Sequence, residues 1–166
     1  MMKQIAGSFE KQKDLVKAIN SMVKENSQLS KQVERFQKNV LGVMARNLED
    51  KIEIIGDARL VISRIEVDNP SQLRDLAFQI RSRYKKVCLV LGAEVDGKAH
   101  LAVMLSDEVQ ERYSLNASTM IREISSEIQG GGGGQPFFAT AGGKNPKGIE
   151  AALEKARKIV VESVKI

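Results

Sequence analysis

The 166-residue sequence has few of the residues that build cross-links and metal sites. It contains one cysteine, one histidine and no tryptophan. A single cysteine excludes a disulfide framework, and one histidine with one cysteine cannot form the clusters that bind zinc. Cys88 lies in the apolar run 87–91, where a small buried residue is expected, and His100 falls in a predicted strand. These absences indicate a reduced, cytoplasmic setting and no cofactor held by this chain.

Long apolar segments are also missing. No run reaches the roughly 18 residues that a membrane-spanning helix needs, so we expect no membrane partner. No basic segment followed by an apolar one opens the chain, and we therefore expect no secretory signal. The adjacent carboxylates at 49–50 and 107–108 lie beside expected turns or helix ends. We expect these carboxylates to lie in solvent and cap the turns or helix ends, and we therefore predict no catalytic residue.

The net charge of +5 is unevenly distributed. Residues 1–48 carry nine Lys or Arg and four Asp or Glu, whereas residues 49–166 carry seventeen of each. A basic surplus favours an anionic partner such as a nucleic acid. The alternative is an ordinary solvated helix face.

Residues 4–48 contain no proline, and their apolar residues recur with a heptad period. Such a pattern over more than four heptads predicts a helix that pairs with another helix. An asparagine at an a position fixes register in parallel dimers, and Asn26 occupies one. The e and g positions that flank these residues carry no complementary charges that would select a partner. The partner helix is therefore either from a second copy or from elsewhere in the same chain. The predicted pairing residues are Leu15, Ile19, Met22, Asn26, Leu29, Val33, Phe36 and Val40.

The remainder of the chain alternates short strands with amphipathic helices. Strands are predicted at 52–55 and 60–67, and again at 87–95 and 98–105 around an Asp-Gly turn. Helices are predicted from Asn69-Pro70, over 116–129, and from Asn145-Pro146. We therefore predict an α+β protein: a coiled-coil-like helical subdomain at 1–50 and a two-layer α/β domain at 51–166, ordered ββα-ββα-loop-α.

A glycine-rich segment follows the predicted helix 116–129. Seven of the fifteen residues from 130 to 144 are glycine, and each glycine costs roughly 0.5–1 kcal/mol of ordering entropy relative to alanine. We expect a loop whose bare N–H groups bind an anion, with a second bend at Gly142-Gly143 beside Lys144 and Lys147. No acidic residue occurs from 130 to 149. The alternative is a flexible linker, which the adjacent Phe137 and Phe138 make less suitable because they favour burial.

The segment also resembles a known family. A glycine run, a proline and Ala139-Thr140-Ala141-Gly142-Gly143 are similar to the DHH-associated domain of DHH-type phosphodiesterases and of alanyl-tRNA synthetase C-termini. The synthetase form is nearer, because its Ala-Gln-Ala-Gly-Gly ending and Asp-Pro helix start resemble 139–143 and 145–146. The resemblance covers 52–166, and the basic N-terminal helix suits the helical subdomain that precedes this domain in the family. Gln135 stands where the family usually has arginine, so it departs from the family at a position where the resemblance implies a phosphate contact.

The resemblance implies a module that grips the outer corner of tRNA and links aminoacylation with editing, with a helical part that aids dimerisation. It implies a parent alanine–tRNA ligase that uses ATP, Mg and Zn, while this chain has no catalytic centre. The alternatives are a structural dimerisation module and the substrate-binding half of a DHH phosphodiesterase, whose Asp-His-His motif is missing here. The predicted RNA-binding residues are Gly130, Gly131, Gly132, Gly133, Gly134, Gln135, Gly142, Gly143, Lys144 and Lys147.

Overall fold

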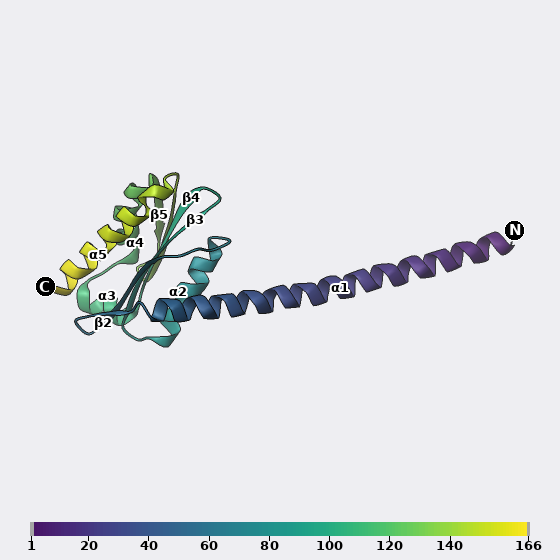
Figure 1. Cartoon of the computed structure of the whole chain (residues 1–166), viewed down its shortest axis with the longest axis horizontal. Helices are drawn as coiled ribbons and strands as arrows, with labels where there is room; N and C mark the ends of the chain where they lie inside the picture. Colours follow the sequence, from purple (N-terminus) through teal and green to yellow (C-terminus); the bar gives the residue numbers. More distant parts are fainter. Residues whose placement is uncertain (1, 166) are drawn as a thin grey trace. The chain divides into compact units, whose positions relative to one another are not determined.

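The computed structural model describes residues 2–165, apart from the side chains of residues 2–4 and 6. The chain divides into two compact units, Met1–Val40 and Leu41–Ile166 (Figure 1). We expected a boundary near residue 50, but the single helix α1 (Met2–Glu49) contributes to both units. Its last turns belong to the second unit because Ala45 and Leu48 are buried in that unit's core.

Within the described residues, six strands form one mixed sheet in the order β1-β2-β3-β4-β6-β5. The strands are β1 (Glu53–Ile55), β2 (Ala58–Arg64), β3 (Val87–Val95), β4 (Lys98–Leu105), β5 (Gly130–Gly134) and β6 (Phe138–Gly143). Only β2 and β3 are parallel, and they are joined through α2 (Ser71–Arg83) because parallel neighbours need a crossover connection. The other neighbours are antiparallel, and Asp96-Gly97 forms the predicted turn between β3 and β4. The predicted α+β class and long N-terminal helix are confirmed.

Helices cover both faces of the sheet (Figure 1). On β3, Val87, Leu89 and Leu91 face α2, whereas Cys88 and Val90 face the opposite side. That opposite side carries α3 (Asp107–Tyr113), α4 (Ala117–Ser125) and α5 (Ile149–Lys165). The unit therefore has three layers where we expected two. The reason is that β3 and β4 are apolar at almost every position, as in strands buried on both faces.

Two further segments differ from the sequence prediction. The short helix α3 was not predicted, although Asp107 and Glu108 occupy its first turn, where carboxylates suit the helix dipole. The predicted helix 116–129 ends earlier, because α4 gives way to a 3₁₀ turn, η1 (Ser126–Ile128). Asn116 caps α4 by accepting a hydrogen bond from the Thr119 N–H at 3.2 Å. Gln129 then adopts a φ of 52°, which ends the helix and lets the chain enter β5.

Asp57, in the turn between β1 and β2, connects three elements. Its carboxylate lies 2.6 Å from the Lys86 ammonium and 3.0 Å from the Arg112 guanidinium, and it accepts a hydrogen bond from the Tyr113 hydroxyl. The hydrogen bonds from Lys86 and Tyr113, together with the charge of Arg112, lower the pKa of Asp57 from 3.8 to about 2. The ionised carboxylate therefore links the edge of the sheet to α3.

We predict that Asp57→Asn destabilises the protein at neutral pH and that this difference disappears in acid. The folded-state pKa is depressed, so the stabilisation exists above the unfolded value near 4 and is lost as pH falls towards 2. Urea unfolding of both proteins between pH 7 and pH 2 measures the difference. Asp75→Asn, at an exposed position of α2, is the matched control. A constant difference across this pH range would contradict the prediction.

Cys88 behaves as the sequence indicated. It is a free thiol, buried within the sheet, and burial raises its pKa to about 12. A thiol held in this state is protonated at physiological pH and packs as a small apolar side chain. Cys88 therefore contributes to the core and offers no reactive site.

Candidate nucleic-acid interface

The glycine segment is an edge strand, which corrects the expected loop. Gly130–Gly134 forms β5, and within the described chain its only strand neighbour is β6. A two-residue turn joins β5 to β6. The Gln135 N–H donates a hydrogen bond to the Phe138 carbonyl at 2.8 Å, and the Phe138 N–H donates one to the Gln135 carbonyl at 3.2 Å. The segment is therefore neither a flexible linker nor a nest of converging amides. The expectation was wrong because local composition does not show that 138–143 supplies a pairing partner.

Three of the five glycines are required by the close approach of β6. A Cβ added at Gly130, Gly132 or Gly134 would lie 1.9, 2.2 or 2.5 Å from a carbonyl oxygen of β6. No side chain fits at such distances. By contrast, a Cβ at Gly131 or Gly133 would meet no atom within 4 Å. Packing against β6 therefore explains why Gly130, Gly132 and Gly134 have no side chains. It does not explain why residues 131 and 133 are also glycine.

The outer edge of β5 exposes peptide groups. In antiparallel pairing, the residues alternate between those bonded to the neighbour and those pointing away from it. Counting from the hydrogen-bonded pair Gln135–Phe138, Gly131 and Gly133 bond to β6, so Gly130, Gly132 and Gly134 direct their N–H and C=O groups outwards. All three are exposed. The edge therefore offers donors and acceptors with no side chains in front of them.

Gly142 and Gly143 lie at the end of β6 and do not form the expected second bend. They pair with Gly131 and Gly130, so the two glycine groups are brought side by side as paired strands. Gly143 is required by the chain behind it, because an added Cβ would lie 2.1 Å from the Ile128 carbonyl oxygen. The Asn145 N–H donates to that same oxygen at 3.0 Å.

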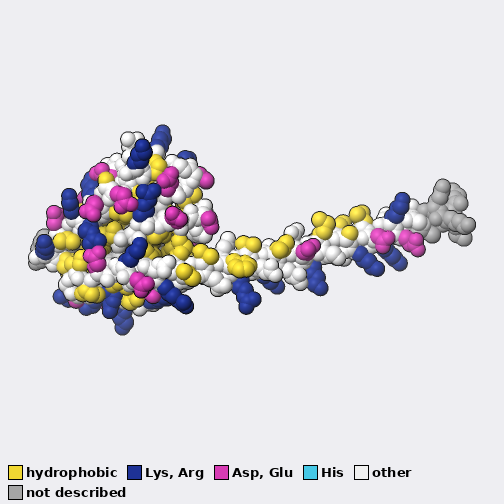
Figure 2. All heavy atoms as spheres, viewed as in Figure 1, with side chains coloured by type: hydrophobic (Ala, Val, Ile, Leu, Met, Phe, Trp, Pro, Cys, Tyr) yellow, Lys and Arg dark blue, Asp and Glu magenta, His cyan; other side chains and the backbone are white. Residues whose placement is uncertain are grey.

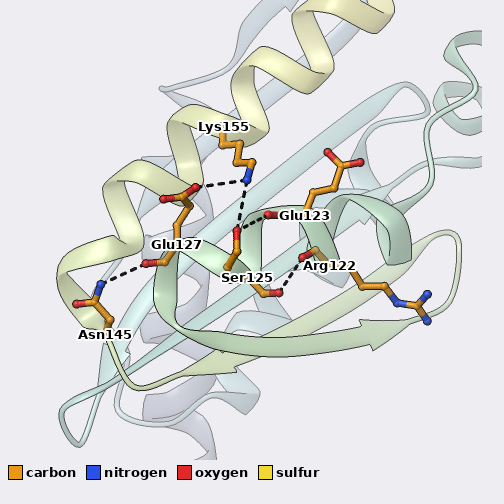
Figure 3. Close-up of polar contacts among 7 residues, drawn as sticks. Arg122, Glu123, Ser125, Glu127, Asn145 and Lys155 are labelled. Carbon is orange, nitrogen blue, oxygen red and sulfur yellow. Dashed lines mark hydrogen bonds and ion pairs between the residues drawn. The ribbon is translucent and has the colours of Figure 1, made fainter.

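Lys144 and Lys147 follow this junction and are both exposed. Lys147 lies in the 3₁₀ turn η2 (Pro146–Gly148) that leads into α5. Asn145 holds the turn against η1, since its side-chain amide donates to the Glu127 carbonyl at 3.2 Å (Figure 3). No described carboxylate forms an ion pair with either lysine. Both ammonium groups therefore remain available to an anionic partner.

One acidic side chain reaches this region through the fold, although none is present in the sequence from 130 to 149. Glu127 lies beside Asn145, and its carboxylate is 3.3 Å from the Lys155 ammonium of α5 (Figure 3). The ion pair offsets the negative charge of Glu127.

A groove of about 540 Å³ lies on the face of the sheet that carries α2, and we name it the α2 groove. Its lining includes Gly131 and Gly142, but also Arg74 of α2 and His100 of β4, which the sequence did not identify as site residues. No local signal could have identified these two side chains. The pairing of β4 with β6 and the crossover through α2 bring them together from distant parts of the sequence.

The predicted pairing residues of α1 lie in the first unit, and the apolar ones among them form an exposed stripe, which we name the seam. The exposed fractions are 60% for Leu15, 63% for Met22 and 69% for Phe36, and no described residue covers them. Figure 2 shows hydrophobic side chains gathered along one side of the helix and most Lys and Arg side chains along the other. Ile19, Leu29, Val33 and Val40 are about half exposed. An exposed stripe of this length is typical of a helix that lacks its partner.

The described residues contain no group of three or more His, Cys, Asp or Glu side chains placed to hold a metal ion. In the same part of the chain, every helix is too short or too polar to span a membrane. The surfaces described above offer groups suited to binding: bare peptide edges, exposed ammonium groups and a groove with one arginine in its lining.

Comparisons with known proteins agree with this geometry. Residues 57–162 match the model of the DHHA1 domain family. The chain is 39% identical over 148 residues to the alanine–tRNA ligase of Cytophaga hutchinsonii, covering 89% of this chain and 17% of that protein. It is 37% identical over 160 residues to the alanine–tRNA ligase of Christiangramia forsetii, covering 96% of this chain and 18% of that protein. The chain thus spans less than a fifth of the length of these relatives.

A solved structure gives the same assignment. The C-Ala domain of alanyl-tRNA synthetase from Aquifex aeolicus superposes with a TM-score of 0.60 at 32% identity. The match covers 67% of this chain and 98% of that domain. The resemblance expected from residues 130–143 is therefore confirmed. The chain belongs to the DHHA1 domain family, in the form found as the C-terminal domain of alanyl-tRNA synthetases.

Proposed function

We propose that this chain is the tRNA-binding C-terminal region of an alanyl-tRNA synthetase, which grips the outer corner of tRNA and couples aminoacylation with editing. The main support is the bare edge strand β5 beside exposed Lys144 and Lys147, within a fold shared with a C-Ala domain. In this proposal the rest of a longer, cytoplasmic enzyme performs alanine–tRNA ligation with ATP, Mg and Zn. This chain supplies binding.

The geometry suits recognition of an RNA backbone. Lysine ammonium groups attract phosphates and release counterions, which makes binding strongly dependent on salt. Structured RNA is recognised largely through its shape and through contacts to phosphates and 2′-hydroxyls. The outward N–H and C=O groups of Gly130, Gly132 and Gly134 can donate to phosphates and accept from hydroxyls without interference from side chains.

We predict that replacing both Lys144 and Lys147 by alanine weakens tRNA binding and flattens its salt dependence. Two lost phosphate contacts correspond to a slope of log affinity against log salt that is less steep by about 1–2. Filter binding or fluorescence anisotropy at several salt concentrations measures both quantities. Lys158→Ala with Lys165→Ala, two exposed lysines on α5, is the charge-matched control. Equal slopes in the two double variants would exclude the lysines from the interface.

The seam supports a second role for α1, helix pairing. We propose that the exposed stripe packs against another helix, either from a second copy or from elsewhere in the longer protein. The specific support is that Leu15, Met22 and Phe36 are each at least 60% exposed although they share one heptad position. Pairing would bury this apolar surface and position the globular unit relative to its partner.

A further inference from the structure

The α2 groove has a floor without side chains. Gly131 of β5 and Gly142 of β6 are directly paired, and Gly142 is in turn paired with His100 of β4. These residues form a row across three neighbouring strands. A Cβ at Gly131 would meet no atom within 4 Å, and a Cβ at Gly142 would come no nearer than 3.9 Å, to Nδ1 of His100. Neither glycine has a positive φ.

Packing and backbone conformation therefore do not require glycine at these two positions, in contrast to Gly130, Gly132 and Gly134. Each glycine still costs roughly 0.5–1 kcal/mol of ordering entropy relative to alanine. What the two positions provide is a flat area of peptide backbone open to the groove. A flat area of this kind favours contact with a planar group, since any side chain there would hold the group away from the sheet.

The walls of the groove carry a cation and a planar ring. Arg74 forms no ion pair with any described carboxylate, and its guanidinium lies 5.5 Å from the centroid of the Phe78 ring. Phe78 in turn packs on Phe138, another residue that lines the groove, with ring centroids 5.3 Å apart. His100 is half-buried, and its ring has no hydrogen bond to a described residue. None of the described residues that line the groove is acidic.

We propose that the α2 groove binds one unstacked nucleotide of the RNA, with its base flat on Gly131 and Gly142 beside the His100 ring and its phosphate against Arg74. This inference rests on the proposed function and specifies where an individual nucleotide is held. A planar base matches the bare floor, and an unpaired guanidinium matches a phosphate. The volume of the groove is sufficient for a single nucleotide and its solvent.

The first experiment uses small probes with the whole chain. Adenosine monophosphate, titrated into isotope-labelled protein, is expected to shift the amide resonances of Gly131, Thr140 and Gly142. Gly131→Val, which places a side chain on the floor, is expected to weaken this binding by about tenfold or more, as for loss of a stacked base. Ala151→Val is the control, because Ala151 is an exposed residue of α5 that lies outside the groove and outside the proposed RNA-binding residues.

Arg74→Ala is expected to weaken binding of the same probe, whereas Arg122→Ala, an exposed arginine of α4 on the other face, leaves it unchanged. The two controls, one with an enlarged side chain and one with a truncated arginine, show how far such changes outside the groove alter binding. Inorganic phosphate alone is expected to bind more weakly than the nucleotide. Equal affinity for phosphate and nucleotide, or equal effects of Gly131→Val and Ala151→Val, would overturn the proposal.

Titrations with tRNA separate this inference from the proposed function. If wild-type protein binds tRNA and Gly131→Val binds it as tightly as Ala151→Val does, the α2 groove is not a nucleotide site although the function stands. If the groove binds the mononucleotide but the chain does not bind tRNA, the proposed function fails while the groove remains a nucleotide site. If Gly131→Val and Arg74→Ala lose tRNA affinity while the control variants keep it, the result supports both the proposed function and the nucleotide site in the α2 groove.

Discussion

Gly148→Ala is expected to destabilise the globular unit by about 3 kcal/mol or more, because the new methyl group meets backbone that cannot move away. Gly148 is buried in η2, and a Cβ there would lie 1.8 Å from the Glu127 carbonyl oxygen. That carbonyl accepts the hydrogen bond from the Asn145 side chain. Alanine would force η1 and η2 apart and disturb the start of both β5 and α5.

Thermal unfolding measures this effect, with an expected decrease in Tm on the order of 10 °C. Gly42→Ala is the matched control with the opposite sign. Gly42 lies within α1, where an added Cβ meets no atom within 4 Å, so alanine should stabilise the helix by about 0.5–1 kcal/mol. A Gly148→Ala variant as stable as the wild type would show that the junction between η1 and η2 is not close-packed in solution.

Leu29→Glu is expected to abolish self-association of the isolated chain. With no described residue covering the seam, a second copy is the only partner available in solution, and we expect a dimer at micromolar concentration. Burial of a leucine contributes about 1.5–3 kcal/mol, and a dimer loses two of them. The dissociation constant should therefore rise by about 100-fold or more. Sedimentation velocity over a range of concentrations measures this change.

Gln28→Glu is the matched control, because it adds the same charge one residue away, on the side of the helix opposite the seam. It should leave the dimer intact. A wild-type chain that sediments as a monomer at micromolar concentration would contradict self-pairing. The partner of the seam would then be a helix elsewhere in the longer protein.

The sequence alone was sufficient for elements whose information is local. The heptad period of residues 15–40 predicted the long helix, because helix formation and the position of an apolar stripe depend on neighbours three and four residues away. Asp96-Gly97 predicted the turn between β3 and β4 for a similar reason, since both residues adopt a positive φ. The motif at 130–143 was sufficient to indicate the family.

Tertiary structure decided what depends on distant partners. Five glycines have no side-chain pattern, so only the pairing with 138–143 showed that they form an edge strand and not a loop. The same pairing distinguishes glycines that β6 requires from those that leave an open floor. Arg74 and His100 joined the site because β-sheet pairing and a crossover helix bring together residues that are remote in sequence. Composition established that the segment was unusual, and long-range contacts determined its shape.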